Sequence, residues 1–291
     1  MPKMIPDGLS KQRILLVGGG KMGSALLQGW HAAGFGVAQF MVNEPAPSEA
    51  LAAAVAVVNP TAEQIGQSPP DIIVLAIKPQ MADSVLPSLL PAVRPSTVVI
   101  SLLAGQPIER LSALLGGHDV IVRTMPNTPA AIGLGMTALI ASDGVSAAQK
   151  QDAGHLMQAV GEIIWLDSEK QMDAVTAISG SGPAYVFYLA ETMIAAGISL
   201  GLSEQVALQL ARQTIAGAAT MMAQPDISPS QLRRNVTSPN GTTEAALDVL
   251  MAETGGLGTL MRQTTQAAAQ RNRDLAHSDK DKNKDKNKDE N

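Results

Sequence analysis

The chain has 291 residues, of which 45% are hydrophobic and only 2% aromatic, and its formal net charge is −5. This length suits one large or two medium-sized domains, with a core built mainly from Ala, Val, Leu, Ile and Met. The absence of cysteine excludes a disulfide scaffold, a zinc–thiolate site and a cysteine nucleophile. The acidic balance argues against a nucleic-acid partner, and the apolar runs are too short to span a membrane. We expect a cytoplasmic protein without a metal site.

Residues 13–166 alternate between strand and helix patterns, after an N-terminal extension of residues 1–12. Seven short runs are apolar, rich in β-branched residues and bounded by Gly, Pro or Asp. Such runs are typical of strands buried on both faces, and the helical patterns between them indicate βαβ units. We therefore expect an α/β domain with a mainly parallel, doubly wound sheet. The expected strands are 13–18, 37–43, 71–77, 97–103, 120–125, 136–142 and 162–166.

The segment RILLVGGGKMGSALLQGW contains the pattern G-x-G-x-x-G, formed by Gly18, Gly20 and Gly23. It follows the first expected strand and opens an Ala/Leu-rich helix, which is the context that a dinucleotide-binding loop requires. Gly18 permits the tight turn, Gly20 lets the backbone approach a pyrophosphate, and Gly23 allows close helix–strand packing. The helix N-terminus then directs N–H groups and a positive dipole toward the phosphates. We interpret residues 13–166 as a Rossmann domain.

The second expected strand ends at Asn43 and Glu44, and Glu44 lies 21 residues after Gly23. An acidic residue at about this distance bonds the adenosine ribose 2′-OH of NAD. No Lys or Arg occurs between Lys21 and Lys78 to receive a 2′-phosphate. The pattern leans toward NADH, but an exposed loop Glu would give the same spacing, and use of both NADH and NADPH stays open.

Residues 167–277 carry no convincing strand pattern and are expected to form an all-α domain. Helical spacing runs through five segments, which Gly, Pro and Ser clusters separate. Their many small residues suit closely packed helices and a helix-mediated homodimer. The tail of residues 278–291 is a low-complexity Lys/Asp segment that we expect to be disordered. The expected helices are 169–178, 182–201, 203–224, 242–255 and 257–276.

The helical domain contains no Lys between Lys170 and Lys280 and no His between His155 and His277. β-Hydroxyacid dehydrogenases share this broad layout, but they use a Lys near a glycine-rich helix start as the base for an alcohol proton. The similar stretch here, Ser179–Phe187, has no such Lys, so the usual base for alcohol oxidation is absent. Reduction of a C=N bond suits these residues better. An imine nitrogen is basic enough to acquire a proton without a strong acid or base on the protein, and a hydroxyl donor suffices to orient it.

Six segments follow one another in the order VGGGKMGSAL, LAIKPQ, SLLAGQ, RTMPNTPA, SGSGPAYVF and VTSPNGTTEAAL. In this combination the chain resembles the pyrroline-5-carboxylate reductase family over residues 13–276. The resemblance implies a Rossmann domain followed by a helical dimerisation domain. It also implies hydride transfer from NADPH or NADH to the imine carbon of L-1-pyrroline-5-carboxylate, giving L-proline in the last step of proline biosynthesis. The implied assembly is a homodimer or a larger ring of dimers.

The resemblance assigns cofactor contacts to five segments of the chain. Two of the assignments have ordinary alternatives, since Lys78 would also suit a solvated strand end and Asn127 a capping residue in a Pro-fixed turn. Asn127 is expected beside the nicotinamide or the substrate. The implied cofactor-binding residues are Gly18, Gly20, Lys21, Met22, Gly23, Asn43, Glu44, Ala76, Ile77, Lys78, Pro79, Ala104, Gly105 and Asn127.

The hydroxyl-rich turn TSPNGTTEAAL precedes the fourth expected helix, and the resemblance makes it the binding site for the substrate carboxylate. The implied contacts are Ser238, Gly241, Thr242 and Thr243, with Thr243 as the catalytic hydrogen-bond donor to the imine nitrogen. Thr242 or Thr243 also suits a plain helix N-cap, and the two roles are compatible. The family usually has Gly where this chain has Asn240, a residue that tolerates left-handed backbone better than most.

Two other readings of the sequence stay open. One is a related imine reductase or a β-hydroxyacid dehydrogenase on the same fold, against which the missing Lys argues. The other is a non-catalytic NAD(P)-binding regulator, which the intact hydroxyl turn disfavours.

Overall fold

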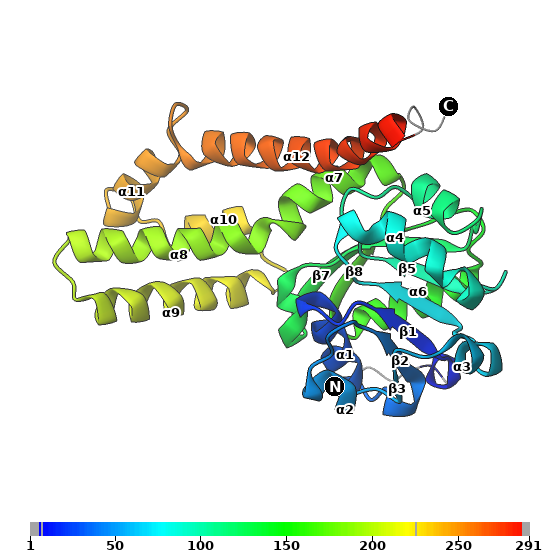
Figure 1. Ribbon diagram of the computed structural model, residues 1–291. Coiled ribbons are helices and arrows are strands. Elements are labelled where there is room, and N and C mark those ends of the chain that lie inside the picture. The colour runs from blue at the N-terminus through cyan, green and yellow to red at the C-terminus, as the bar shows by residue number, and fades with distance from the viewer. Residues whose placement is uncertain (1–5, 7, 225, 287–291) are drawn as a thin grey trace. The chain divides into compact units, whose positions relative to one another are not determined.

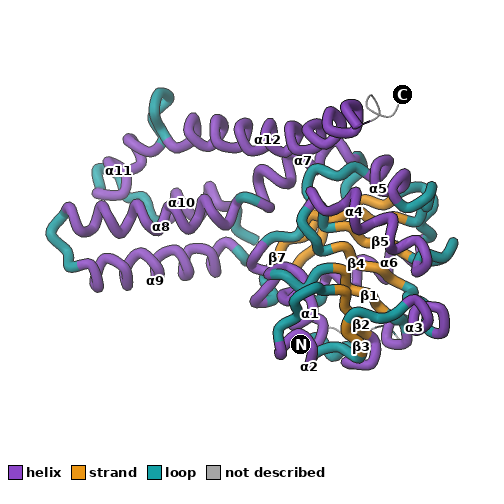
Figure 2. Tube along the Cα trace, in the orientation of Figure 1, coloured by secondary structure: helices purple, strands orange, loops and turns teal. Residues whose placement is uncertain are grey.

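The computed structural model describes residues 6, 8–224 and 226–286, with side chains as far as Asp274. The chain forms two compact units (Figures 1 and 2). Unit 1 comprises Met1–Gly180 and Ala268–Asn291, and unit 2 comprises Ser181–Ala267. Each unit is described by itself.

Unit 1 is built on one eight-stranded sheet in the order β3-β2-β1-β4-β5-β6-β7-β8. All neighbouring strands are parallel except β6 and β7, which are antiparallel. The expected Rossmann fold with a mainly parallel sheet is thus confirmed. The strands are β1 (Ile14–Val17), β2 (Phe40–Asn43), β3 (Val57–Val58), β4 (Ile72–Leu75), β5 (Val98–Ser101), β6 (Ile121–Met125), β7 (Gly135–Ala141) and β8 (Gly161–Trp165).

Helices cover both faces of this sheet (Figure 1). Successive residues of a strand point to opposite faces, so Ile14 and Leu16 of β1 join one apolar cluster and Leu15 and Val17 join the other. The first cluster includes residues of α1 (Lys21–Ala32), α2 (Glu49–Ala53) and α6 (Ala147–Gln158). The second includes residues of α3 (Ala62–Gln67), α4 (Ala82–Val85), the 3₁₀ helix Leu86–Ala92 and α5 (Ile108–Leu114).

The C-terminal part of α12 (Leu257–Lys286) belongs to unit 1 together with α7 (Met172–Val175). Asn272 is 3% exposed, and its Nδ2 donates to Asp173 Oδ1 at 2.7 Å. Arg273 Nη1 lies 3.9 Å from the other carboxylate oxygen of Asp173. The compact unit therefore closes with residues from near the end of the chain.

Unit 2 is helical, and its described residues form no buried apolar cluster of their own. It contains α8 (Gly182–Ser199), α9 (Glu204–Met222), α10 (Pro229–Asn235), α11 (Thr242–Leu250) and the first part of α12. No residue of α8, α10 or α11 is buried, and α9 buries only Ala207 and Ala211. Apolar side chains of α8 such as Phe187 and Leu189 are instead exposed, at 62% and 45%.

Three features of the structure differ from the sequence-based expectations. The two-residue strand β3 and the short helix α10 were not predicted. Helix α12 continues to Lys286, past residue 278, where disorder was expected. Extending an existing helix avoids the unfavourable nucleation step, which explains how a polar segment continues one. Residues 287–291 lie outside the described residues.

Candidate active site

The glycine loop joins β1 to α1, and each of its three motif glycines meets a different environment. Gly18 has φ +100°, and a Cβ there would lie 2.7 Å from the carbonyl oxygen of Ala76. A Cβ on Gly23 would lie 2.1 Å from the Gly18 carbonyl oxygen, so that helix and loop touch through bare backbone. Gly20 faces open space, and it is the N-cap of α1 without a side chain as a cap. The loop is therefore closed on its protein side and open where a ligand would approach.

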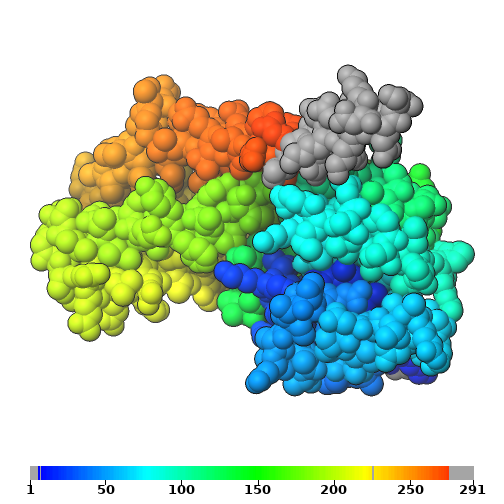
Figure 3. Space-filling model, in the orientation of Figure 1, coloured from blue at the N-terminus to red at the C-terminus, as the bar shows by residue number. Residues whose placement is uncertain are grey.

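A cavity of about 480 Å³ lies in front of this loop. It is formed at the carboxyl ends of β1, β2 and β4, the edge at which open α/β sheets bind ligands. In Figure 3 the dark blue N-terminal segment is visible in a hollow between lighter blue and cyan parts of unit 1. The predicted residues that line the cavity are Gly18, Gly20, Asn43, Glu44, Ala76, Ile77 and Lys78.

The carboxylate of Glu44 reaches the glycine loop itself. Its Oε2 accepts a hydrogen bond from the Gly19 N–H at 2.7 Å, and its Oε1 accepts one from the Ala46 N–H at 3.2 Å. Glu44 thus stands against the phosphate loop rather than free in solvent. The exposed Lys78 also lines this cavity, which therefore carries a carboxylate from Glu44 and an ammonium group from Lys78.

Other predicted cofactor residues do not line this cavity. Lys21, Met22 and Gly23 belong to the first turn of α1, and Pro79 opens the 3₁₀ helix Pro79–Met81. Ala104 and Gly105 lie in the loop after β5, where Gly105 has φ +71°. The cavity is also lined by residues that the sequence did not indicate, namely Val17, Pro45, Asn59, Met81 and Val85. The Asn-Pro pair after the Val57–Val58 run was the available signal for Asn59.

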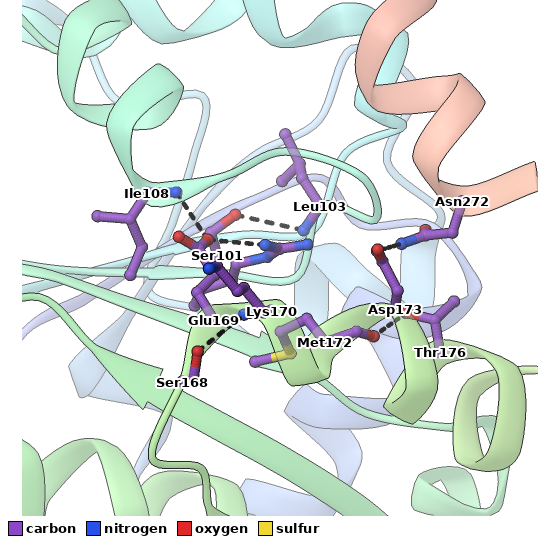
Figure 4. A network of polar contacts seen from close by, with 11 residues as sticks. Ser101, Leu103, Ile108, Ser168, Glu169, Lys170, Met172, Asp173, Thr176 and Asn272 are labelled. Atoms are coloured by element: carbon purple, nitrogen blue, oxygen red, sulfur yellow. Dashed lines mark hydrogen bonds and ion pairs between the residues drawn. The ribbon is translucent and has the colours of Figure 1, made fainter. Parts of the chain in front are cut away.

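A partly buried ion pair fixes the segment after the Ala104–Gly105 loop. Arg123 of β6 is 4% exposed, and its Nη1 donates to Glu169 Oε1 at 2.7 Å. The same carboxylate oxygen accepts a hydrogen bond from the Ile108 N–H at 2.9 Å (Figure 4). The charge of Arg123 strengthens this arrangement, because charge-assisted bonds are the stronger ones. Glu169 therefore ties the start of α5 to β6.

Asn127 follows β6, and both the oxygen and the nitrogen of its side-chain amide form hydrogen bonds within the protein. Its Oδ1 accepts from the Met136 N–H at 2.9 Å, and its Nδ2 donates to the Ser179 carbonyl and hydroxyl oxygens at 3.2 and 3.3 Å. Asn127 is also the N-cap residue of the 3₁₀ helix Thr128–Ile132, although its side chain makes no cap bond. The side chain joins the glycine-rich segment at Ser179 to the start of β7.

In unit 2 the hydroxyl turn leads into α11. Gly241 is the N-cap, so Thr242 and Thr243 occupy the first two helical positions and neither is the cap. The Gly241 N–H donates to the Ser238 carbonyl at 3.0 Å, and Asn240 adopts the left-handed conformation with φ +57°. The turn therefore forms with Asn240 in place of the usual glycine.

Glu244 makes a further contact in this turn. Its Oε2 accepts a hydrogen bond from the Asn240 N–H at 2.6 Å. Glu244 is the third residue of α11, from which acidic side chains usually bond back to the N-cap N–H; here the bond reaches one residue further, to Asn240. That spacing was the signal that would have predicted the contact.

Comparisons with known proteins cover nearly the whole chain. The pyrroline-5-carboxylate reductase of Pseudomonas aeruginosa is 44% identical over 272 residues, which is 92% of this chain and 98% of the relative. The chain belongs to the pyrroline-5-carboxylate reductase family. The family resemblance drawn from the six sequence segments is thereby confirmed.

Further matches agree with this membership. A model described as pyrroline-5-carboxylate reductase dimerisation matches residues 169–275, and one described as NADP oxidoreductase, coenzyme F420-dependent, matches residues 13–105. The solved reductase of Coxiella burnetii is 35% identical, with TM-score 0.82 over 91% of this chain and 98% of that one. The Plasmodium falciparum enzyme, solved with NADP bound, is 30% identical, with TM-score 0.80 over 92% of this chain and 99% of that one.

Two features are absent from the part of the chain that the structure describes. No group of three or more His, Cys, Asp or Glu side chains there is arranged to hold a metal ion. Among the helices described, none combines the length and the apolarity needed to cross a bilayer.

Proposed function

We propose that this protein reduces the C=N bond of L-1-pyrroline-5-carboxylate to L-proline with NADH or NADPH. The observation that carries the proposal is 44% identity to a named reductase over 92% of the chain. The residues agree with it, because the helical segment between Lys170 and Lys280 has no Lys for alcohol oxidation but has a hydroxyl turn before α11.

The pyrophosphate and adenosine ribose of the dinucleotide suit the cavity in front of the glycine loop. Gly20 leaves open space where a side chain would block a pyrophosphate, and the first turn of α1 offers N–H groups and a positive dipole. The 480 Å³ cavity extends from this loop to Glu44 and Lys78. When bound, the reduced nicotinamide supplies the hydride for the imine carbon, and we place it near Ala104, Gly105 and Asn127.

The chain's own contribution to catalysis lies in the turn before α11. Ser238 and Thr242 hold the substrate carboxylate through hydroxyl and backbone N–H groups, which the helix dipole assists. Gly241 places no side chain at the N-cap between them, while its own N–H stays bonded to the Ser238 carbonyl oxygen. The Thr243 hydroxyl donates a hydrogen bond to the imine nitrogen. That bond orients the neutral imine nitrogen and stabilises the negative charge that develops on it as hydride reaches the carbon. The proton that completes the N–H bond of proline passes from the Thr243 hydroxyl, which takes one back from water. No general base is required on the chain.

Glu44 favours NADH over NADPH in this proposal. Its carboxylate lies at the end of β2 beside the glycine loop, where it would accept a hydrogen bond from a ribose 2′-OH and repel a 2′-phosphate. Lys78 lines the same cavity and attracts anionic groups of either cofactor. The expected preference is therefore a bias rather than an exclusion.

A homodimer, or a ring of dimers, completes the protein. The dimerisation model matches residues 169–275, and unit 2 exposes large apolar side chains along α8 and α9. An apolar surface of this kind marks a protein interface. A second copy of the chain is the partner we assign to it.

The deciding experiment is a turnover assay with pyrroline-5-carboxylate and NADH or NADPH side by side, with proline measured as the product. We expect proline with both cofactors and a higher kcat/KM with NADH. Faster turnover of other cyclic imines or of 3-hydroxyacids would favour the related reductase or dehydrogenase. Cofactor binding without turnover of any of these substrates would favour the non-catalytic regulator.

A further inference from the structure

Asn59 lies just after β3, at the outer edge of the sheet. β3 pairs with β2 through only two residues, Val57 and Val58. Asn59 itself has φ +49°, one of the two positive φ values among the non-glycine residues that the structure describes. Non-glycine residues rarely adopt this backbone conformation, and Asn is one of the few that tolerate it. The unusual backbone directs an amide side chain back toward the end of β2.

Beyond the two paired residues of β3, the side chain of Asn59 hydrogen-bonds the main chain that follows β2. Its Oδ1 accepts a hydrogen bond from the Glu44 N–H at 2.9 Å, and its Nδ2 donates to the Glu44 carbonyl oxygen at 3.0 Å. The Asn59 N–H also donates to the Val42 carbonyl oxygen at 2.7 Å. An amide side chain carries one acceptor and two donors, so it replaces a paired peptide group. The main chain of Glu44 is therefore held on both sides of its Cα atom.

The same two residues line the cofactor cavity. Glu44 turns its carboxylate to the Gly19 N–H, and its main chain rests on Asn59. If the main chain of Glu44 shifts, its carboxylate moves with it. The direction of this carboxylate relative to the ribose thus depends on Asn59.

We propose that Asn59 is a positioning residue that sets cofactor preference by clamping the main chain of Glu44. This inference rests on the proposed role of Glu44 toward the ribose 2′-OH. Asn59 acts on the bound cofactor through Glu44, not by discriminating the 2′-substituent directly.

Asn59→Gly tests the clamp, because glycine accepts φ +49° and only the two side-chain bonds to Glu44 are lost. Dissociation constants for NADH and NADPH are measured by fluorescence titration of the full-length protein. We expect the NADH constant to rise about three- to tenfold, as for the loss of one to two modest hydrogen bonds, with a smaller change for NADPH. An unchanged ratio of the two constants would overturn the proposal.

Asn59→Asp keeps the acceptor for the Glu44 N–H but places an oxygen against the Glu44 carbonyl. The NADH constant should rise at least as much as in Asn59→Gly. The NADPH constant is not compared for this variant, because the new carboxylate lines the same cavity and would itself repel a 2′-phosphate. The matched control is Gln64→Ala, which removes the capping box of α3 five residues away without touching Glu44. The control should lower the melting temperature slightly and leave the ratio of constants as it is. An equal change of ratio in the control would mean that loss of local order explains the effect, which also overturns the proposal.

Glu44→Ala separates this inference from the function on which it rests. If Glu44→Ala leaves the ratio of constants unchanged, the proposed role of Glu44 fails, and the clamp has nothing to position. If Glu44→Ala changes the ratio and Asn59→Gly does not, only the clamp fails. In the double variant we expect no further change of ratio beyond Glu44→Ala. Additive effects would show that Asn59 acts on the cofactor directly and would reject the mechanism.

Discussion

The two units of this protein bury their apolar side chains to very different degrees. Unit 1 packs Leu, Ile and Val side chains onto both faces of its sheet, and many of them are fully buried. In α8 and α9 of unit 2, only Ala207 and Ala211 are buried, while residues such as Phe187 and Leu210 are exposed by more than half. A single chain thus supplies the core for the cofactor-binding unit. The helices of unit 2 need the surface of another chain to bury their exposed apolar side chains.

The largest effect should come from Phe187→Asp in α8. A charge there would have to be buried in the apolar dimer interface, where it lacks a partner. We expect light scattering after size-exclusion chromatography to show monomers, and turnover to fall below detection. NADH binding to unit 1 should persist. Gln224→Asp, at an exposed polar position after α9, is the control and should remain dimeric. A dimeric, active Phe187→Asp protein would contradict the claim that unit 2, unlike unit 1, needs a partner to bury its apolar side chains.

Leu16→Ala should damage unit 1 from within. Leu16 is fully buried in β1, and truncation of a buried Leu to Ala costs about 2–5 kcal/mol of unfolding free energy. Because the lost contacts lie within one chain, the loss should not depend on protein concentration, which urea titrations at two concentrations would check. The destabilisation of Phe187→Asp should depend on concentration, since it acts on association. The same dependence in both variants would contradict a self-sufficient core in unit 1.

Thr243→Ala tests chemistry that we assign to unit 2 alone. Loss of one oriented donor to developing charge costs about 2.7–4 kcal/mol, or roughly 10²–10³-fold in rate. We expect kcat/KM for pyrroline-5-carboxylate to fall by that factor and NADH affinity to stay the same, because the cavity that we assign to NADH lies in unit 1. Thr243→Ser retains the hydroxyl and should recover most of the activity. Wild-type kcat/KM in Thr243→Ala would remove Thr243 from the mechanism.

Glu44→Gln should give the smallest effect and sharpen the assignment of the cofactor to unit 1. The amide retains hydrogen bonding but loses the charge that repels a 2′-phosphate. We expect the kcat/KM ratio of NADH to NADPH to fall about five- to tenfold, equivalent to roughly 1 kcal/mol for one charge interaction near a surface. Steady-state assays with both cofactors measure this ratio. An equal ratio in both proteins would show that Glu44 does not sense the 2′-substituent.

Structural features that depend on residues close together in the sequence were predicted, and features that depend on residues far apart in the sequence were missed. All seven expected strands are present, because runs such as 71–77 are apolar on both faces. β3 escaped notice since two residues carry no periodicity, and its pairing with β2 comes from tertiary structure. α10 escaped notice because its Ser228 cap and Pro229 also resemble a turn.

The same rule holds in the candidate site. The glycine loop was readable because its turn, cap and helix are contiguous in sequence. The contact of Asn59 with the main chain of Glu44 was not, because the two residues are 15 positions apart and meet only through the pairing of β2 with β3. The roles of Ser238 and Thr243 remain predictions, drawn from the family resemblance and supported by the position of their turn before α11.

The bond between Asp173 and Asn272 bears on how the protein is made. These residues are 99 positions apart, and the whole of unit 2 lies between them in sequence. During synthesis the last segment of unit 1, from Ala268 onward, leaves the ribosome only after the helices of unit 2 have emerged. Contacts over such a separation form slowly, because a long loop must close first. The nascent unit 1 therefore has all eight strands before the C-terminal part of α12 can reach Asp173, and it is completed only after the helices of unit 2 have been made.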